Sequence, residues 1–534
     1  MKLNSESLHF EINPSRYKPI GYIRNSYREN GKVKHQTISK IHGLSHEQLQ
    51  NMKAAFDGAA VKYDDIKLSG GREYGASELL YILAKKIGLD TLIYSRNGTW
   101  VRNALAMIIG RIIYQGSKLA LSKIASISCL WEVCGAKDIA IDVDKNCYDA
   151  MDEILARQNL IQKKLVSKHL SDGSIILYDI TSTYFEGEFE DSQIIDFGYN
   201  RDKKRRKKQI IIALICTKEG CPVAVEVFSG NTPDSTTVQD KIQEIKKDYG
   251  VSNFIFVGDR GMLTQKNIDK CTDIDTITAL KHVAIKKLCE EQNVQLSMFD
   301  EKLTTEVILP EEPEIRYALR KNPVRAQKQQ KNRSELIQKT DDALAEIATP
   351  RKKVADKTLA ARAAKVFYKY KTEKYFTWDI QERKIIYSRK EDIIADEERY
   401  DGLYVIRSNV SSDIMTIREI VETYKSLINV EQAFRNIKTV QLEIRPIYHR
   451  TDERIKSHVF ICMLSYYLLW HMNKALKPLY EDPEHPEFTL NHVIETMKAL
   501  QKLKLTVGNI TTDTVAEPTE MQRHIQKLVL GCVM

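Results

Sequence analysis

The sequence predicts an α/β protein whose mixed sheet is interrupted by an α+β insertion and preceded by a helical domain. Three observations support this fold class. Residues 77–170 show helical periodicity, residues 174–281 alternate apolar β-rich runs with a single helical pattern, and a basic segment at 316–374 separates these runs from a later amphipathic helix. With 534 residues, the chain is long enough for two to four domains with ample core.

The chain begins with two β-like runs around Asn30-Gly31, the dipeptide typical of a tight hairpin turn. A structural hairpin and a DNA-contacting hairpin are both compatible with this pattern. The segments that we expect are a β-hairpin module at 1–70, a helical domain at 71–170 that is a candidate for DNA binding, the first part of the sheet core at 171–282, a basic α+β insertion at 283–400, the second part of the core at 401–480 and a helical tail at 481–534.

Positive charge is concentrated rather than spread along the chain. The formal net charge is +9, but residues 316–374 alone hold 17 Lys and Arg against 6 Asp and Glu, or +11, so the remainder nets −2. Residues 201–208 add a run of seven bases and one acid. Concentrated charge on a balanced chain indicates a polyanion partner, because neutralising phosphates releases counterions. Taken singly, each run is equally compatible with a solvated charged surface.

The nine cysteines are scattered and show no spacing typical of a zinc site or a disulfide framework, so reduced thiols are expected. The N-terminal residues lack an apolar signal segment. The longest apolar run, at 459–470, is too short to span a bilayer and predicts a buried core helix. We therefore expect a soluble cytoplasmic protein with no membrane partner.

Two aspartates lie in apolar strands. Asp179 sits inside the run at 174–185, and Asp259 ends the run at 253–258. Two meandering strands and a right-handed helical crossover separate them, which predicts that their strands become neighbours at the edge where open α/β sheets carry sites. One such aspartate is often structural, but two at the same edge favour a metal site.

A third acid, Glu431, lies on the amphipathic helix that follows the insertion. Ser412 or Asp413 is the expected N-cap. At about 100° per residue, Glu431 falls within the apolar stripe, where an uncompensated carboxylate costs several kcal/mol. Either a Lys or Arg partner or a divalent metal must compensate it, and the helix alone favours the ion pair.

Four segments resemble the DDE transposases of bacterial insertion sequences, in the branch with a Y-x2-R-x3-E-x6-K signature. They are YDITSTYFEG around Asp179, VFSGNTPDSTT at 227–237, FVGDRG around Asp259 and YKSLINVEQAFRNIK at 424–438. The resemblance implies a ribonuclease-H-like core with an inserted domain between the second and third acids. It also implies that Asp179, Asp259 and Glu431 bind two divalent metal ions, Mg²⁺ or Mn²⁺ by their preference for oxygen ligands.

The signature is incomplete, because Leu427 stands where the family has arginine. We expect Arg435 to replace that base rather than Lys425, which should project from another helix face. Arg260 either holds a phosphate or pairs with a carboxylate. The residues expected to contact DNA are Tyr424, Arg435, Lys438, Arg260, Lys204, Arg205 and Arg206.

The function implied is metal-dependent cleavage at the ends of a mobile element, followed by attack of the freed 3′-hydroxyl on target DNA in cut-and-paste transposition. The expected partners are double-stranded DNA, as terminal inverted repeats and target, and a second copy of the chain in the synaptic complex. Two alternatives are a catalytically inactive DNA-binding protein of transposase descent, which Leu427 favours, and a structure-specific nuclease on the same fold.

Overall fold

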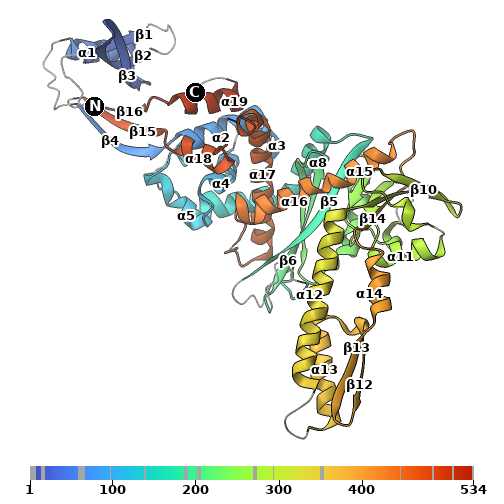
Figure 1. Ribbon diagram of the computed structural model, residues 1–534. Coiled ribbons are helices and arrows are strands. Elements are labelled where there is room, and N and C mark those ends of the chain that lie inside the picture. The colour runs from blue at the N-terminus through green and yellow to red at the C-terminus, as the bar shows by residue number, and fades with distance from the viewer. Residues whose placement is uncertain are drawn as a thin grey trace.

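The computed structural model describes residues 8–13, 19–57, 66–96, 98–136, 140–185, 191–199, 201, 206–268, 274–292, 294–348, 354–445, 447–483, 486–507 and 510–531. The molecule is elongated (Figure 1). A small sheet lies at one end, followed by a group of helices, a large central sheet and a narrow arm that projects from it.

The small sheet contains the predicted hairpin. Strands β2 (Ile20–Glu29) and β3 (Lys32–Ile41) pair antiparallel around a turn in which Asn30 and Gly31 have φ of 53° and 76°. Positive φ at both positions is the geometry of a type I′ turn, which Asn-Gly adopts at little cost. The hairpin prediction is confirmed.

The C-terminal segment completes this sheet, whose strand order is β1-β2-β3-β16-β15-β4, with β1 spanning Leu8–Asn13. Strands β15 (Gln501–Val507) and β16 (Ile510–Val515) lie between helices α18 (Leu490–Lys498) and α19 (Glu520–Leu530). The prediction of a helical tail at 481–534 is therefore wrong. These strands are stabilised by pairing with β3 and with β4 (Ile66–Glu73), which lie more than 400 residues earlier, and local periodicity does not report such partners.

The helical region is built around α17 (Asp452–Tyr480), which packs against α4 (Thr99–Tyr114), α7 (Asp149–Ala156) and strand β7 (Pro222–Ser229) of the central sheet. Its residues 459–469 are all buried, as predicted for a core helix. Among the described residues, no single helix has the length and composition to cross a membrane. Helices 99–114 and 118–126 have them only when taken together, and the chain bends by 104° between these two helices.

The central sheet has the order β10-β11-β14-β9-β8-β5-β6-β7. Strands β5 (Ser174–Tyr184), β6 (Gln209–Thr217) and β7 (Pro222–Ser229) form an antiparallel meander. Helix α9 (Thr237–Lys247) then leads to β8 (Phe254–Gly258), which pairs parallel with β5. The predicted adjacency of the two aspartate strands is confirmed, with Tyr178 opposite Gly258.

The insertion adds two strands, β10 and β11, to the central sheet and also forms the arm. Strands β9 (Asp275–Ala279) and β14 (Leu403–Ser408) pair antiparallel, and β11 (Glu312–Lys321) and β10 (Thr305–Leu309) extend the same sheet beyond β14. The arm (Figure 1) has its own apolar cluster, and its elements are α12 (Pro323–Ala348), α13 (Asp356–Tyr370), β12 (Phe376–Gln381), β13 (Lys384–Arg389) and α14 (Glu391–Glu398).

Two buried histidines make the fold sensitive to acid. Burial lowers the pKa of His449 to about 3 and that of His458 well below its ordinary value, with Lys118 and Arg111 adding to both shifts. Because these pKa values lie below the unfolded value of about 6.5, stability is full above that pH and is lost as the pH falls towards the folded pKa. Between pH 7 and 5 His449 should cost about 2 kcal/mol, and His458 should add a loss of the same sign.

Urea unfolding of the wild type at these two pH values measures the loss. The variant His449→Gln should lose about 2 kcal/mol less than the wild type over the same interval, since one group that titrates only in the unfolded chain is removed. An equal loss in both proteins would contradict the assignment to His449.

Candidate active site

One pocket, of about 630 Å³, brings together the three acids. It lies where β5 and β8 meet α15 (Ile417–Lys425), α16 (Leu427–Arg435) and the start of α12. Asp179, Asp259 and Glu431 all line it. Residues separated by up to 252 positions thus share one wall, because the parallel pairing of β5 and β8 and the packing of α16 on β5 place them there.

Asp179 is the most deeply placed of the three acids. It is half-buried on β5. Its pKa is raised to about 7, chiefly by burial and to a smaller extent by the negative charges of Glu431 and Asp259, while the backbone N–H of Ile180 and the Arg201 guanidinium oppose the shift. Asp179 therefore lies within electrostatic range of both other acids.

Asp259 immediately follows β8 and is exposed in the pocket. The backbone N–H of Arg260 donates to its Oδ1 at 2.8 Å. Arg260 is also exposed and lines the pocket, so its guanidinium is available to a ligand there.

Glu431 is exposed on the pocket wall, so the expectation that it is buried in an apolar stripe is wrong. The helix is interrupted at Ser426, between α15 and α16, but its apolar row continues, since Ile420, Leu427 and Phe434 are buried at seven-residue spacing. Glu431 is exposed because the pocket, and not another element, borders its side of the helix. The helix also begins later than predicted. Thr416, in a capping box with Glu419, is the N-cap in place of Ser412 or Asp413.

The bases that face the acids differ from those expected. Tyr424 and Lys425 line the pocket, as does the apolar Leu427 in the signature's arginine position. Burial raises the pKa of Tyr424, with Asp259 and Glu431 adding to the shift and Arg260 opposing it. Arg435 is exposed but does not line the pocket, so the expectation that it rather than Lys425 faces the site is wrong.

Lys438 is held against the strand that carries Asp179. It lies in the π-helical turn Asn436–Val440, and its Nζ donates to Thr181 Oγ1 at 3.2 Å and to the Ser182 carbonyl at 2.7 Å. The Thr181 contact lies two residues after Asp179, so Lys438 joins the Glu431 helix to β5 beside the pocket.

Three further polar residues lie near the acids and have no distinguishing signal in the sequence. Arg201 donates from Nη1 to the Ile180 carbonyl at 2.7 Å and forms an ion pair with Asp234. Arg325 and Gln329, from α12, line the pocket itself. All three lie in or beside the basic segments, whose charge was visible in the sequence, but composition does not identify which bases reach the acids.

The remaining predicted DNA contacts lie in the basic run before β6. Arg206 is exposed, has a left-handed φ of 59° and does not line the acidic pocket. Lys204 and Arg205 lie outside the described residues.

Comparison with known proteins bears on the identity of this site. No curated protein matches the sequence significantly. Among solved structures, one similar chain comes from a cryo-EM structure of the piggyBac transposase synaptic complex with hairpin DNA. It is 9% identical, with 79% of this chain and 76% of that chain covered, and its TM-score of 0.35 is too low to support a conclusion.

Residues 170–468 match the family model of the transposase DDE domain. That match covers more than half of the chain and all three acids, and the protein therefore belongs to the DDE transposase family of polynucleotidyl transferases.

Proposed function

We propose that Asp179, Asp259 and Glu431 bind two divalent metal ions, Mg²⁺ or Mn²⁺, and carry out cut-and-paste transposition. The convergence of the three acids on one pocket is the observation that carries this proposal. Carboxylate oxygens suit these hard cations, and a bound cation would offset both the burial and the repulsion that raise the pKa of Asp179. The three acids are not among the groups of described residues whose ligand atoms all lie within 4.8 Å of one another, so they form an open group rather than a closed cage.

When bound, such ions activate the attacking water or 3′-hydroxyl and stabilise the leaving oxygen of an in-line displacement at phosphorus. The protein supplies the remaining functions. Tyr424, Lys425 and Arg260 face the pocket and would hold DNA phosphates beside the acids. Lys438 maintains the position of the Glu431 helix on β5 through its contacts with Thr181 and Ser182.

The proposed fold is a ribonuclease-H-like core of the bacterial insertion-sequence branch. The antiparallel meander β5-β6-β7, the crossover through α9 and the parallel strands β8 and β9 support it. The proposed partners are double-stranded DNA carrying terminal inverted repeats, target DNA and a second copy of the chain, because synapsis joins two DNA ends.

The decisive experiment uses a labelled DNA fragment that bears the inverted repeats flanking the reading frame. With Mg²⁺ and an unlabelled target, the proposal requires cleavage at the repeat and joining of the 3′ end. Cleavage without joining would instead identify a structure-specific nuclease. Retention of the fragment without either reaction would identify a DNA-binding protein that lacks catalysis.

The position of Lys425 gives a prediction about DNA binding. Replacing Lys425 by alanine removes a base that lines the pocket, so affinity for DNA should fall and the slope of log K against log salt should decrease by about 1. The matched variant is Arg435→Ala, which removes an exposed base outside the pocket. If only Arg435→Ala decreases the slope, then Arg435, and not Lys425, supplies the base that replaces the signature's arginine.

A further inference from the structure

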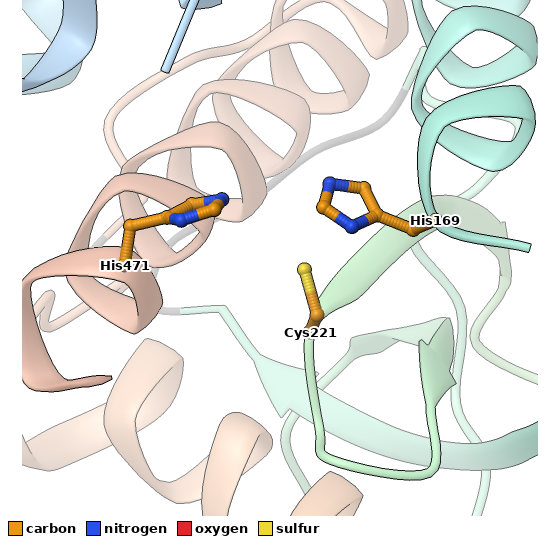
Figure 2. A group of neighbouring side chains, drawn as sticks. All are labelled: His169, Cys221 and His471. Carbon is orange, nitrogen blue, oxygen red and sulfur yellow. The ribbon is translucent and has the colours of Figure 1, made fainter. Parts of the chain in front are cut away.

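A cluster of two imidazoles and a thiol lies outside the acidic pocket. His169 is the last residue of α8 (Gln158–His169), Cys221 directly precedes β7, and His471 lies on α17. One ligand atom from each side chain lies within 4.8 Å of the other two. The two rings flank a gap into which the thiol points (Figure 2). Among the described residues, this is the group of three that is close enough to hold one ion.

The hydrogen bonds of the cluster leave nitrogen lone pairs available. The Nε2 of His471 is buried and has no hydrogen-bond partner. The Nε2 of His169 lies 2.9 Å from Tyr467 Oη, so the tautomer protonated on Nε2 donates there and carries its lone pair on Nδ1. Histidines that bind metals commonly donate their second ring N–H to such a partner, which fixes the ring orientation.

The charge state of the cluster also suits coordination. Burial lowers the pKa of His169, and it lowers that of His471 to about 4, so both rings are neutral at pH 7. Burial raises the pKa of the Cys221 thiol, which therefore keeps its proton until a cation replaces it. Lys168 and Lys474 lie nearby and oppose a cation, and the negative charge of a thiolate would offset them.

We propose that His169, Cys221 and His471 form a binding site for a transition metal of the zinc class. Two imidazole nitrogens and one thiolate sulfur are the donors that Zn²⁺ prefers, and three protein ligands leave a fourth tetrahedral position for water. Binding replaces the thiol proton, which passes to solvent, and involves no change of oxidation state. The oxygen-preferring ions of the acidic pocket would not compete for this donor set.

The location indicates a structural role that reaches the active site. The turn that carries Cys221 also contacts α16, where Asn429 Nδ2 donates to the Lys218 carbonyl at 2.8 Å. Trp470, next to His471, donates from Nε1 to the Glu219 carbonyl at 3.1 Å. A metal at the cluster would therefore fasten α17 to the turn that supports α16, two residues before Glu431.

Cobalt(II) tests the site, because a thiolate–cobalt bond gives a charge-transfer band in the near ultraviolet that carboxylate ligands do not give. The full-length protein is stripped with a chelator and titrated with Co²⁺. The proposal requires this band to saturate at one ion per chain, together with intense visible d–d bands of tetrahedral cobalt. Cys221→Ser should abolish the charge-transfer band, whereas the control Cys289→Ser, at a half-buried cysteine of α11 (His282–Glu291), should retain it.

A second measurement covers the case in which Cys221→Ser does not fold. His471→Gln leaves the thiol in place but removes one nitrogen ligand, so the tetrahedral d–d bands should weaken and Co²⁺ should bind at least tenfold more weakly. Zn²⁺ should raise the thermal midpoint of the stripped wild type but not that of His471→Gln. Absence of a thiolate–cobalt band in the wild type, or an unchanged band in Cys221→Ser, would overturn the proposal.

Discussion

Replacing Glu431 by glutamine should reduce DNA joining by at least about a hundredfold. That factor is the upper end of the loss of activity caused by removing a residue that only orients a metal ligand, and Glu431 is proposed as a ligand itself. Glutamine keeps the size of the side chain but removes the negative charge that it contributes to the pocket. Because Glu431 is exposed on the wall, the change does not create a buried cavity. Stability and DNA affinity should therefore stay close to those of the wild type.

The matched control is Glu422→Gln, which removes the same charge from an exposed position on α15 that does not line the pocket. Joining is measured with the labelled repeat fragment at saturating Mg²⁺, and affinity is measured on the same fragment. Full activity in Glu431→Gln would remove Glu431 from the catalytic group. Equal losses in both variants would indicate a general effect of charge on DNA binding.

Replacing Asp401 by asparagine should destabilise the base of the arm by about 3–5 kcal/mol, the cost of leaving one member of a buried ion pair without its partner. Arg333, on α12, donates from Nη1 to Asp401 Oδ1 at 3.0 Å, and the second nitrogen binds the other carboxylate oxygen. The two side chains are only 8% and 10% exposed. Asparagine offers one acceptor and no charge, so the buried guanidinium of Arg333 keeps only the more distant Glu398, 3.6 Å from Nη2, as an ionic partner.

Hydrogen exchange of α12 measures this loss, and its amides should exchange at least a hundredfold faster in Asp401→Asn, as a change of about 3 kcal/mol implies. Glu335→Gln, which breaks an exposed pair with Lys339 on the same helix, should change stability by less than about 1 kcal/mol. The double variant Arg333→Met, Asp401→Leu should recover most of the protection. Continued destabilisation in the double variant would show that packing, rather than the unpaired charge, dominates.

Elements with strong local signals could be predicted from the sequence. Asn30-Gly31 fixes a hairpin through its own backbone preference, and the apolar β-branched runs around Asp179 and Asp259 fix two strands. The handedness of the crossover then suffices to make these strands neighbours. Two of the three acids could therefore be placed at one sheet edge without the structure.

Features that depend on distant contacts could not be predicted. Helical periodicity gives the buried row of α15 and α16 but not the extent of the pocket beside it, which Lys425 lines and Arg435 does not. Strands β15 and β16 need partners more than 400 residues away. Likewise, His169, Cys221 and His471 lie too far apart in the chain for ligand spacing to reveal them.

The most direct test of the proposed active site is an anomalous difference map from crystals that contain Mn²⁺ and a bound DNA end. The account requires manganese peaks within coordination distance of Asp179, Asp259 and Glu431, next to the scissile phosphate. Manganese bound elsewhere, or an acidic pocket that stays empty at saturating Mn²⁺ while DNA is bound, would contradict it.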